Sequence, residues 1–287
     1  MEKVNTLIIG AQKAGTTSLY EYMRQHPDIH FSKVKEVTFF VKDQYYSKGE
    51  DYYHSFFDSK SKAPIKASAY VHMLPCSKCP ARVKAYNEDM KFIVLLREPW
   101  DRAYSSFRYA VKNGWEKQAT DLADSVRFEK MRLENEEYDL TYLSNGKYFE
   151  HLSNWMRQFD QEKFFLATNE ELQINPDLLL KRLCEFLAID SSFEFDTQTR
   201  YNQSATIKSK LLQRLLLTKD SKFIPKIGRL LPAKLRVFIR SEIFSRLLKW
   251  NDKPAVKQIE RSCAPLPGMT EFFKEDQRLL QEMLNSK

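Results

Sequence analysis

The chain has 287 residues and a formal net charge of +8. Hydrophobic residues make up 43% of it, with 7 Gly and 11 Pro, which excludes a linker-dominated, low-complexity protein and allows a sizeable core. The sequence contains no apolar stretch of about 18 residues, and its N-terminus lacks a basic-then-apolar signal pattern. We therefore expect a cytoplasmic protein without a transmembrane helix.

The first two thirds of the chain alternate between short apolar runs and helical patterns. Buried strands are predicted at Thr6–Ile9, Ile65–Ala67, Phe92–Leu96 and Phe164–Ala167. Helices are predicted at Thr16–Gln25, Asp101–Lys112, Phe149–Phe159 and Pro176–Leu187, with a charged surface helix at Asp121–Glu137. Strands that are apolar on both faces and alternate with helices predict an α/β fold with a parallel central sheet.

The last third of the chain has a different character. Between Lys208 and Trp250, twelve Lys or Arg residues stand against two acids, and an amphipathic helix is predicted at Met269–Leu284. Such a basic segment suits a glycan, an anionic membrane surface or nucleic acid, or forms a solvated helical face. We expect one domain over residues 1–287, with an α/β core at 1–200 and a basic helical extension at 201–287.

The first predicted strand leads into a candidate anion-binding loop, Gly10-Ala11-Gln12-Lys13-Ala14-Gly15-Thr16-Thr17-Ser18. A small-residue turn before a helix presents free N–H groups and the positive end of the helix dipole to a ligand. The pattern differs from the nucleoside triphosphate loop G-x-x-x-x-G-K-[ST], because Thr16 replaces the lysine and Lys13 comes earlier. The displaced lysine indicates an anion of another shape.

A second candidate anion site follows the strand Phe92–Leu96. Arg97 comes directly after this strand, and Pro99 suits the first turn of the next helix, which places Ser105 about two turns into it. A guanidinium together with a hydroxyl can bind a phosphate dianion.

Two further segments supply candidates for proton transfer and charge stabilisation. Glu36 is either a general base or a solvated surface acid, and His72 is an alternative base. Lys13 and Lys66 are candidate cations for charge that develops during group transfer.

Together these motifs resemble the P-loop sulfotransferases. The loop Gly10–Leu19 resembles their 5′-phosphosulfate loop, and Arg97 with Ser105 resembles their 3′-phosphate motif. Lys-Glu-x-x-Phe-Phe at 35–40 and Lys-x-Ser-x-Tyr at 66–70 resemble the heparan-sulfate-type branch, in which this glutamate is the base. The resemblance implies a P-loop NTPase-like three-layer fold.

The resemblance also implies an activity: transfer of a sulfuryl group from 3′-phosphoadenosine-5′-phosphosulfate (PAPS) to an acceptor hydroxyl or amine. Adenosine 3′,5′-bisphosphate (PAP) would be the product, without a catalytic metal or a nucleic-acid partner. A saccharide, glycolipid or related metabolite is the expected acceptor, with a possible peripheral membrane contact through 208–250. A non-catalytic nucleotide-binding scaffold and a P-loop kinase are the alternatives.

The resemblance distributes the site residues between donor and acceptor. The donor-binding residues are Gly10, Lys13, Ala14, Gly15, Thr16, Thr17, Ser18, Arg97 and Ser105, and the acceptor-side residues are Lys35, Phe40, Ser68, Tyr70 and His72. One departure concerns Thr17, because the carbohydrate branch commonly carries an arginine at this position.

Overall fold

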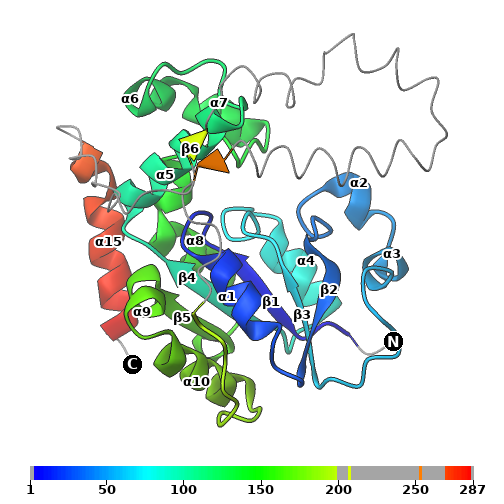
Figure 1. Cartoon of the computed structure of the whole chain (residues 1–287). Coiled ribbons are helices and arrows are strands. Elements are labelled where there is room, and N and C mark those ends of the chain that lie inside the picture. Colours follow the sequence, from blue (N-terminus) through cyan, green and yellow to red (C-terminus); the bar gives the residue numbers. More distant parts are fainter. Residues whose placement is uncertain (1–2, 199–205, 208–251, 254–268, 286–287) are drawn as a thin grey trace, which may run out of the picture.

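The computed structural model describes residues 3–198, 206–207, 252–253 and 269–285 (Figure 1). Five parallel strands form the central sheet in the order β2-β3-β1-β4-β5. Their bounds are β1 (Thr6–Gly10), β2 (Ile29–Glu36), β3 (Ile65–Ala69), β4 (Lys91–Leu96) and β5 (Phe164–Thr168). The predicted α/β class and all four predicted strands are confirmed.

Helices connect and cover these strands. Before β4 they are α1 (Thr16–Met23), α2 (Asp43–Tyr46), α3 (Glu50–His54) and α4 (Cys79–Tyr86). After β4 they are α5 (Pro99–Lys112), α6 (Leu122–Ser125), α7 (Glu129–Glu134), α8 (Tyr148–Met156), α9 (Asn169–Ile174), α10 (Pro176–Leu187) and α15 (Met269–Asn285). Two short strands, β6 (Thr206–Ile207) and β7 (Asp252–Lys253), pair with each other in antiparallel orientation.

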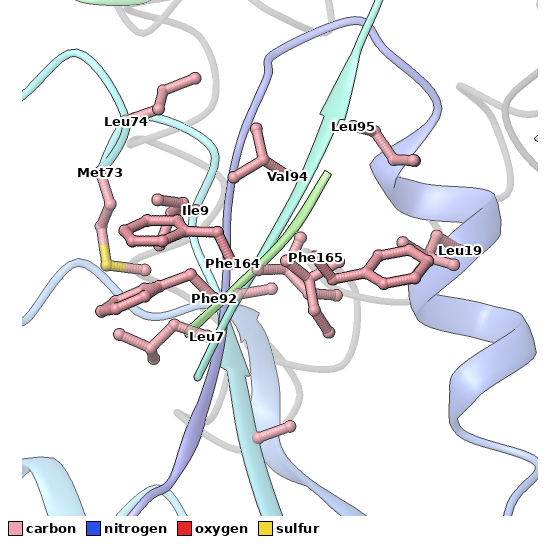
Figure 2. Packing of buried hydrophobic residues seen from close by; sticks show 14 of the residues in the cluster. Leu7, Ile9, Leu19, Met73, Leu74, Phe92, Val94, Leu95, Phe164 and Phe165 are labelled. Atoms are coloured by element: carbon pink, nitrogen blue, oxygen red, sulfur yellow. The ribbon is translucent and has the colours of Figure 1, made fainter. Parts of the chain in front are cut away.

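Strands β1, β3 and β4, in the middle of the sheet, are buried on both faces along almost their whole length. Figure 2 shows Phe92 and Phe164 on one side of the sheet, and Phe165 with Leu19 of α1 on the other. Trp155 of α8 packs edge-on against Phe92, with ring centroids 5.0 Å apart. The sheet therefore lies between two layers of helices. Because the strands are parallel, their carboxyl ends lie at the same edge of the sheet.

One helix prediction was wrong. The segment Asp121–Glu137 is not one continuous surface helix but two short helices, α6 and α7, separated by a 3-10 turn at Val126–Phe128. Glu129 and Arg132 within it are buried. The carboxylate of Glu129 accepts hydrogen bonds from the backbone N–H groups of Tyr142 and Leu143, so a charge that suggested solvent exposure instead anchors a loop.

The last described helix, α15, returns to the α/β core and lies beside α8 (Figure 1). Phe273 is 2% exposed and packs against Gly146, where an added Cβ would lie 2.8 Å from its ring. Leu280 is buried in the main core. The predicted helix 269–284 is therefore confirmed, whereas the basic segment 208–250 lies outside the described residues. No described helix combines the length and apolarity needed to cross a bilayer.

We expect Asp276→Ala to lower the free energy of unfolding by about 1 kcal/mol, the usual effect of losing a helix cap. The Asp276 carboxylate accepts hydrogen bonds from the backbone N–H groups of Phe149 and Glu150, each at 3.0 Å, at the N-terminus of α8. Negative charge there also interacts favourably with the helix dipole. Thermal unfolding should show a melting temperature lower by about 2–4 °C. Glu271→Ala, at an exposed position of α15 paired with Lys274, is the control; an equal loss in both variants would contradict the capping role.

Candidate active site

The loop between β1 and α1 adopts a conformation that needs glycine at position 15. Gly15 has φ 94°, in the left-handed region, and a Cβ there would lie 2.7 Å from Nδ2 of Asn169. The Asn169 amide donates a hydrogen bond of 3.0 Å to the carbonyl of Ala14. The start of α9 thus fastens the loop, whose helix N-terminus begins at Thr16.

Lys13 and Arg97 meet at the carboxyl edge of the sheet. Arg97 Nη1 donates a hydrogen bond of 3.3 Å to the backbone carbonyl of Lys13. The backbone of Lys13 lies in the left-handed region, with φ 66°. The Tyr148 hydroxyl donates in turn to the Arg97 carbonyl at 2.9 Å. The Lys13 ammonium lies over the ring of Tyr109, 4.3 Å from its centroid. The two candidate anion sites are therefore adjacent.

Helix α5 borders the loop with one face. Ser106 donates a hydrogen bond of 2.7 Å to the Gln12 side chain. Tyr109, which contacts Lys13, lies four residues after Ser105, so both share a helix face. Ser105 is 9% exposed.

Glu36 ends β2 at the same edge, in register with Ala69 of β3. Lys35 Nζ lies 3.0 Å from Glu36 Oε1 and donates a hydrogen bond of 2.8 Å to Thr17 Oγ1 of the loop. The Glu36 side chain is 43% exposed, so solvent and ligands can reach it. A carboxylate, an ammonium and a loop hydroxyl thus form one contiguous group, and Lys35 brings positive charge beside Thr17.

His72 and Tyr70 lie near this group. His72 is 3% exposed, and its Nε2 lies 2.9 Å from Oδ1 of Asp139, which also accepts a hydrogen bond of 3.1 Å from Gln12 of the loop. Burial would raise the pKa of Asp139, but the hydrogen bond and charge of His72 hold it below its usual range. Burial raises the pKa of Tyr70, and the charges of Asp139 and Glu36 raise it further. His72 braces the loop through Asp139; its action as a base stays a prediction.

Three predicted site residues are buried. Lys66 is 4% exposed, and its backbone N–H donates a hydrogen bond to the side chain of Asn5, just before β1. Phe40 and Ser68 are each 1% exposed. The roles predicted for these three residues stay predictions.

Sequence reasoning missed two functional neighbours. Tyr109, which covers the Lys13 ammonium, and Asn169, which fastens the loop, come from elements distant in sequence. Neither belongs to a motif, although Asn169 comes two residues after the end of the predicted strand Phe164–Ala167, where loop-facing polar residues are common in parallel sheets.

A glycine loop that joins a parallel strand to a helix N-terminus, with an arginine beside it, defines a P-loop α/β protein built to bind a phosphorylated ligand. The family model for the sulfotransferase domain matches residues 3–229. The chain therefore belongs to the sulfotransferase domain family, which confirms the resemblance found in its motifs.

Curated relatives and a solved structure agree with this assignment. The chain is 28% identical over 211 residues to the bifunctional heparan sulfate N-deacetylase/N-sulfotransferase 1 of Caenorhabditis elegans, covering 72% of this chain and 24% of that protein. It is 26% identical over 244 residues to the human heparan sulfate glucosamine 3-O-sulfotransferase 3B1, covering 82% of this chain and 60% of that protein. The match thus covers from 24% to 60% of the length of these two relatives.

The crystal structure of a sulfotransferase from Alicyclobacillus acidocaldarius matches with a TM-score of 0.62 and 26% identity. The match covers 80% of this chain and 95% of the other. The heparan-sulfate relatives place this chain close to the carbohydrate-type branch of the family.

Proposed function

We propose that this protein transfers a sulfuryl group from PAPS to a hydroxyl or amine of a saccharide, glycolipid or related metabolite and releases PAP. The observation that carries the proposal is the link from Glu36 through Lys35 to Thr17, at 3.0 and 2.8 Å, which places an accessible carboxylate beside the anion loop. The heparan sulfate enzymes among the relatives support a saccharide acceptor.

The donor would occupy the carboxyl edge of the sheet. The N-terminus of α1 would hold the 5′-phosphosulfate, together with the predicted loop residues Gly10, Ala14, Gly15, Thr16, Thr17 and Ser18. Arg97, which contacts the loop, and Ser105, on the same helix face as Tyr109, would hold the 3′-phosphate. ATP has no 3′-phosphate, so the Arg97 site favours PAPS over ATP.

The proposed reaction is an in-line displacement at sulfur. The acceptor oxygen or nitrogen forms a bond to sulfur as the bond from sulfur to the bridging oxygen breaks, and PAP leaves with that electron pair. Glu36 takes the acceptor proton. Lys13 and Lys35 stabilise the negative charge on the sulfonyl and leaving oxygens. This assignment rests on side chains and loop N–H groups, without a metal.

PAP should stabilise the wild-type protein, and Arg97→Ala should remove that effect. A ligand that binds only the folded state at about 100 times its dissociation constant adds about 2.7 kcal/mol to the free energy of unfolding. Thermal unfolding with PAP, AMP, ATP and magnesium–ATP measures this directly. PAP is expected to raise the melting temperature more than AMP or ATP, because Arg97 pairs with its 3′-phosphate.

Arg108→Ala is the matched control, because Arg108 is an exposed arginine on α5 whose side chain lies near Tyr104. This variant should keep the full response to PAP. A response to magnesium–ATP with none to PAP would overturn the proposed function and favour a kinase.

A further inference from the structure

The side chain of Gln12, in the anion loop, is held at both ends of its amide. Its Oε1 accepts a hydrogen bond of 2.7 Å from Ser106 Oγ of α5, and its Nε2 donates one of 3.1 Å to Asp139 Oδ1. Gln12 is 9% exposed and Ser106 is 1% exposed, so water competes little for the bond between them. Because Lys13 follows Gln12 directly, this amide fixes the loop immediately before the lysine.

These two hydrogen bonds connect the two candidate phosphate sites. Gln12 belongs to the loop that would hold the 5′-phosphosulfate, and Ser106 follows Ser105, which would hold the 3′-phosphate. A ligand with both phosphates must reach the loop and α5 at once, whereas a ligand with only a 5′-phosphate needs the loop alone. A fixed distance between loop and helix therefore favours the bisphosphate, because less order has to be imposed when it binds.

Asp139 is itself anchored by residues outside the loop. Its Oδ1 also lies 2.9 Å from Nε2 of His72, which is 3% exposed. The ring of Tyr138 stacks against the His72 ring, with centroids 6.0 Å apart and planes inclined by 22°. Glu136 Oε1 lies 2.5 Å from Lys78 Nζ, which ties the same segment to the start of α4. Asp139 thus offers Gln12 a fixed acceptor, although its side chain is 52% exposed.

We propose, on the basis of the proposed function, that Asp139 is a positioning residue for the donor. Through Gln12 it holds the anion loop at the distance from α5 that a ligand with 5′- and 3′-phosphates requires. The effect passes through the Gln12 amide, so Asp139 needs no contact with the ligand. Loss of the Asp139 oxygen should therefore weaken the binding of PAP much more than the binding of AMP.

Isothermal titration calorimetry of the full chain with PAP and with AMP measures this difference. Asp139→Ala should raise the Kd for PAP about tenfold, the equivalent of about 1.4 kcal/mol, and change the Kd for AMP by less than about twofold. Asp139→Asn removes the same charge but keeps an oxygen for Gln12, so its Kd for PAP should stay within about threefold of the wild-type value. Asp89→Ala, which replaces an exposed acid paired with Lys163, is the control and should change neither Kd.

A double-mutant cycle shows whether Asp139 acts through Gln12. If it does, Gln12→Ala already removes the connection, and adding Asp139→Ala should raise the Kd for PAP no further. Two independent effects would instead multiply in the double variant. Thermal unfolding of each variant without ligand separates a loss of folding from a loss of positioning.

Four results would overturn the inference while leaving the donor site intact: an unchanged Kd for PAP in Asp139→Ala, equal losses for PAP and AMP, a loss in Asp139→Asn as large as in Asp139→Ala, or multiplied losses in the double variant. A wild-type protein that does not bind PAP would instead overturn the proposed function itself.

Discussion

Replacing Glu36 with glutamine is expected to lower kcat about 10²–10⁴-fold, the usual contribution of a well-placed general base. Glutamine has nearly the same shape and can still accept a hydrogen bond from Lys35, but it cannot take the acceptor proton. The donor should bind as before, because Glu36 reaches the loop only through Lys35 and Thr17. Steady-state rates at saturating PAPS, measured alongside thermal stabilisation by PAP, separate these two effects.

Glu50→Gln provides the comparison, since Glu50 is an exposed acid at the start of α3 that belongs to no part of the proposed site. Its kcat should match that of the wild type. If Glu36→Gln retains wild-type kcat while responding normally to PAP, another group removes the proton, and His72 with its Asp139 partner becomes the residue to replace next.

Glu116→Gln is expected to lower the free energy of unfolding by about 3–5 kcal/mol, because it leaves the charge of Arg132 buried and uncompensated. The two side chains are both 0% exposed, and Arg132 Nη2 donates to Glu116 Oε1 at 2.8 Å. The Tyr142 hydroxyl donates to the other carboxylate oxygen at 2.7 Å. The melting temperature should fall by roughly 6–20 °C.

The difference in the free energy of unfolding between the wild type and Glu116→Gln should depend on pH in a defined direction. Burial alone would raise the pKa of Glu116, but hydrogen bonds from the Ala119 backbone and the Arg132 guanidinium lower it from 4.5 to about 2. A group whose pKa is depressed by folding stabilises the protein above its unfolded pKa and loses that contribution as pH falls through the folded value. The gap between wild type and Glu116→Gln should therefore be full above about pH 4.5 and narrow toward pH 2.

The double replacement Glu116→Leu with Arg132→Met is the matched control. It removes both charges at once, so it should be more stable than Glu116→Gln. If the free energy of unfolding of Glu116→Gln lies within about 1 kcal/mol of the wild-type value, the Glu116–Arg132 pair contributes little to stability.

Most of the fold could be predicted from the sequence, including four of the five strands of the central sheet. The loop and Arg97 could be identified because each follows a strand that is apolar on both faces. Strand β2 was missed because it lies at the edge of the sheet, where Ile29–Glu36 mixes polar and apolar residues and gives no buried run. Periodicity carries little information for such a strand.

One other error has a different cause. Glu129 and Arg132 look like solvated charges in a helical segment, yet both are buried, because Glu129 accepts a hydrogen bond from the backbone N–H of Tyr142 and Arg132 pairs with Glu116. Contacts between residues more than ten positions apart decided this case.

The position of α15 has a consequence for the order of synthesis. About 80 residues separate the end of α10 from the start of α15, and translation proceeds at about 5–20 residues per second, so the α/β core waits roughly 4–16 s for its last helix. During that interval the apolar surface later covered by Phe273 and Leu280 faces water. A nascent chain therefore passes through an interval in which its core lacks this helix, and transiently exposed apolar surface of that kind is prone to aggregate.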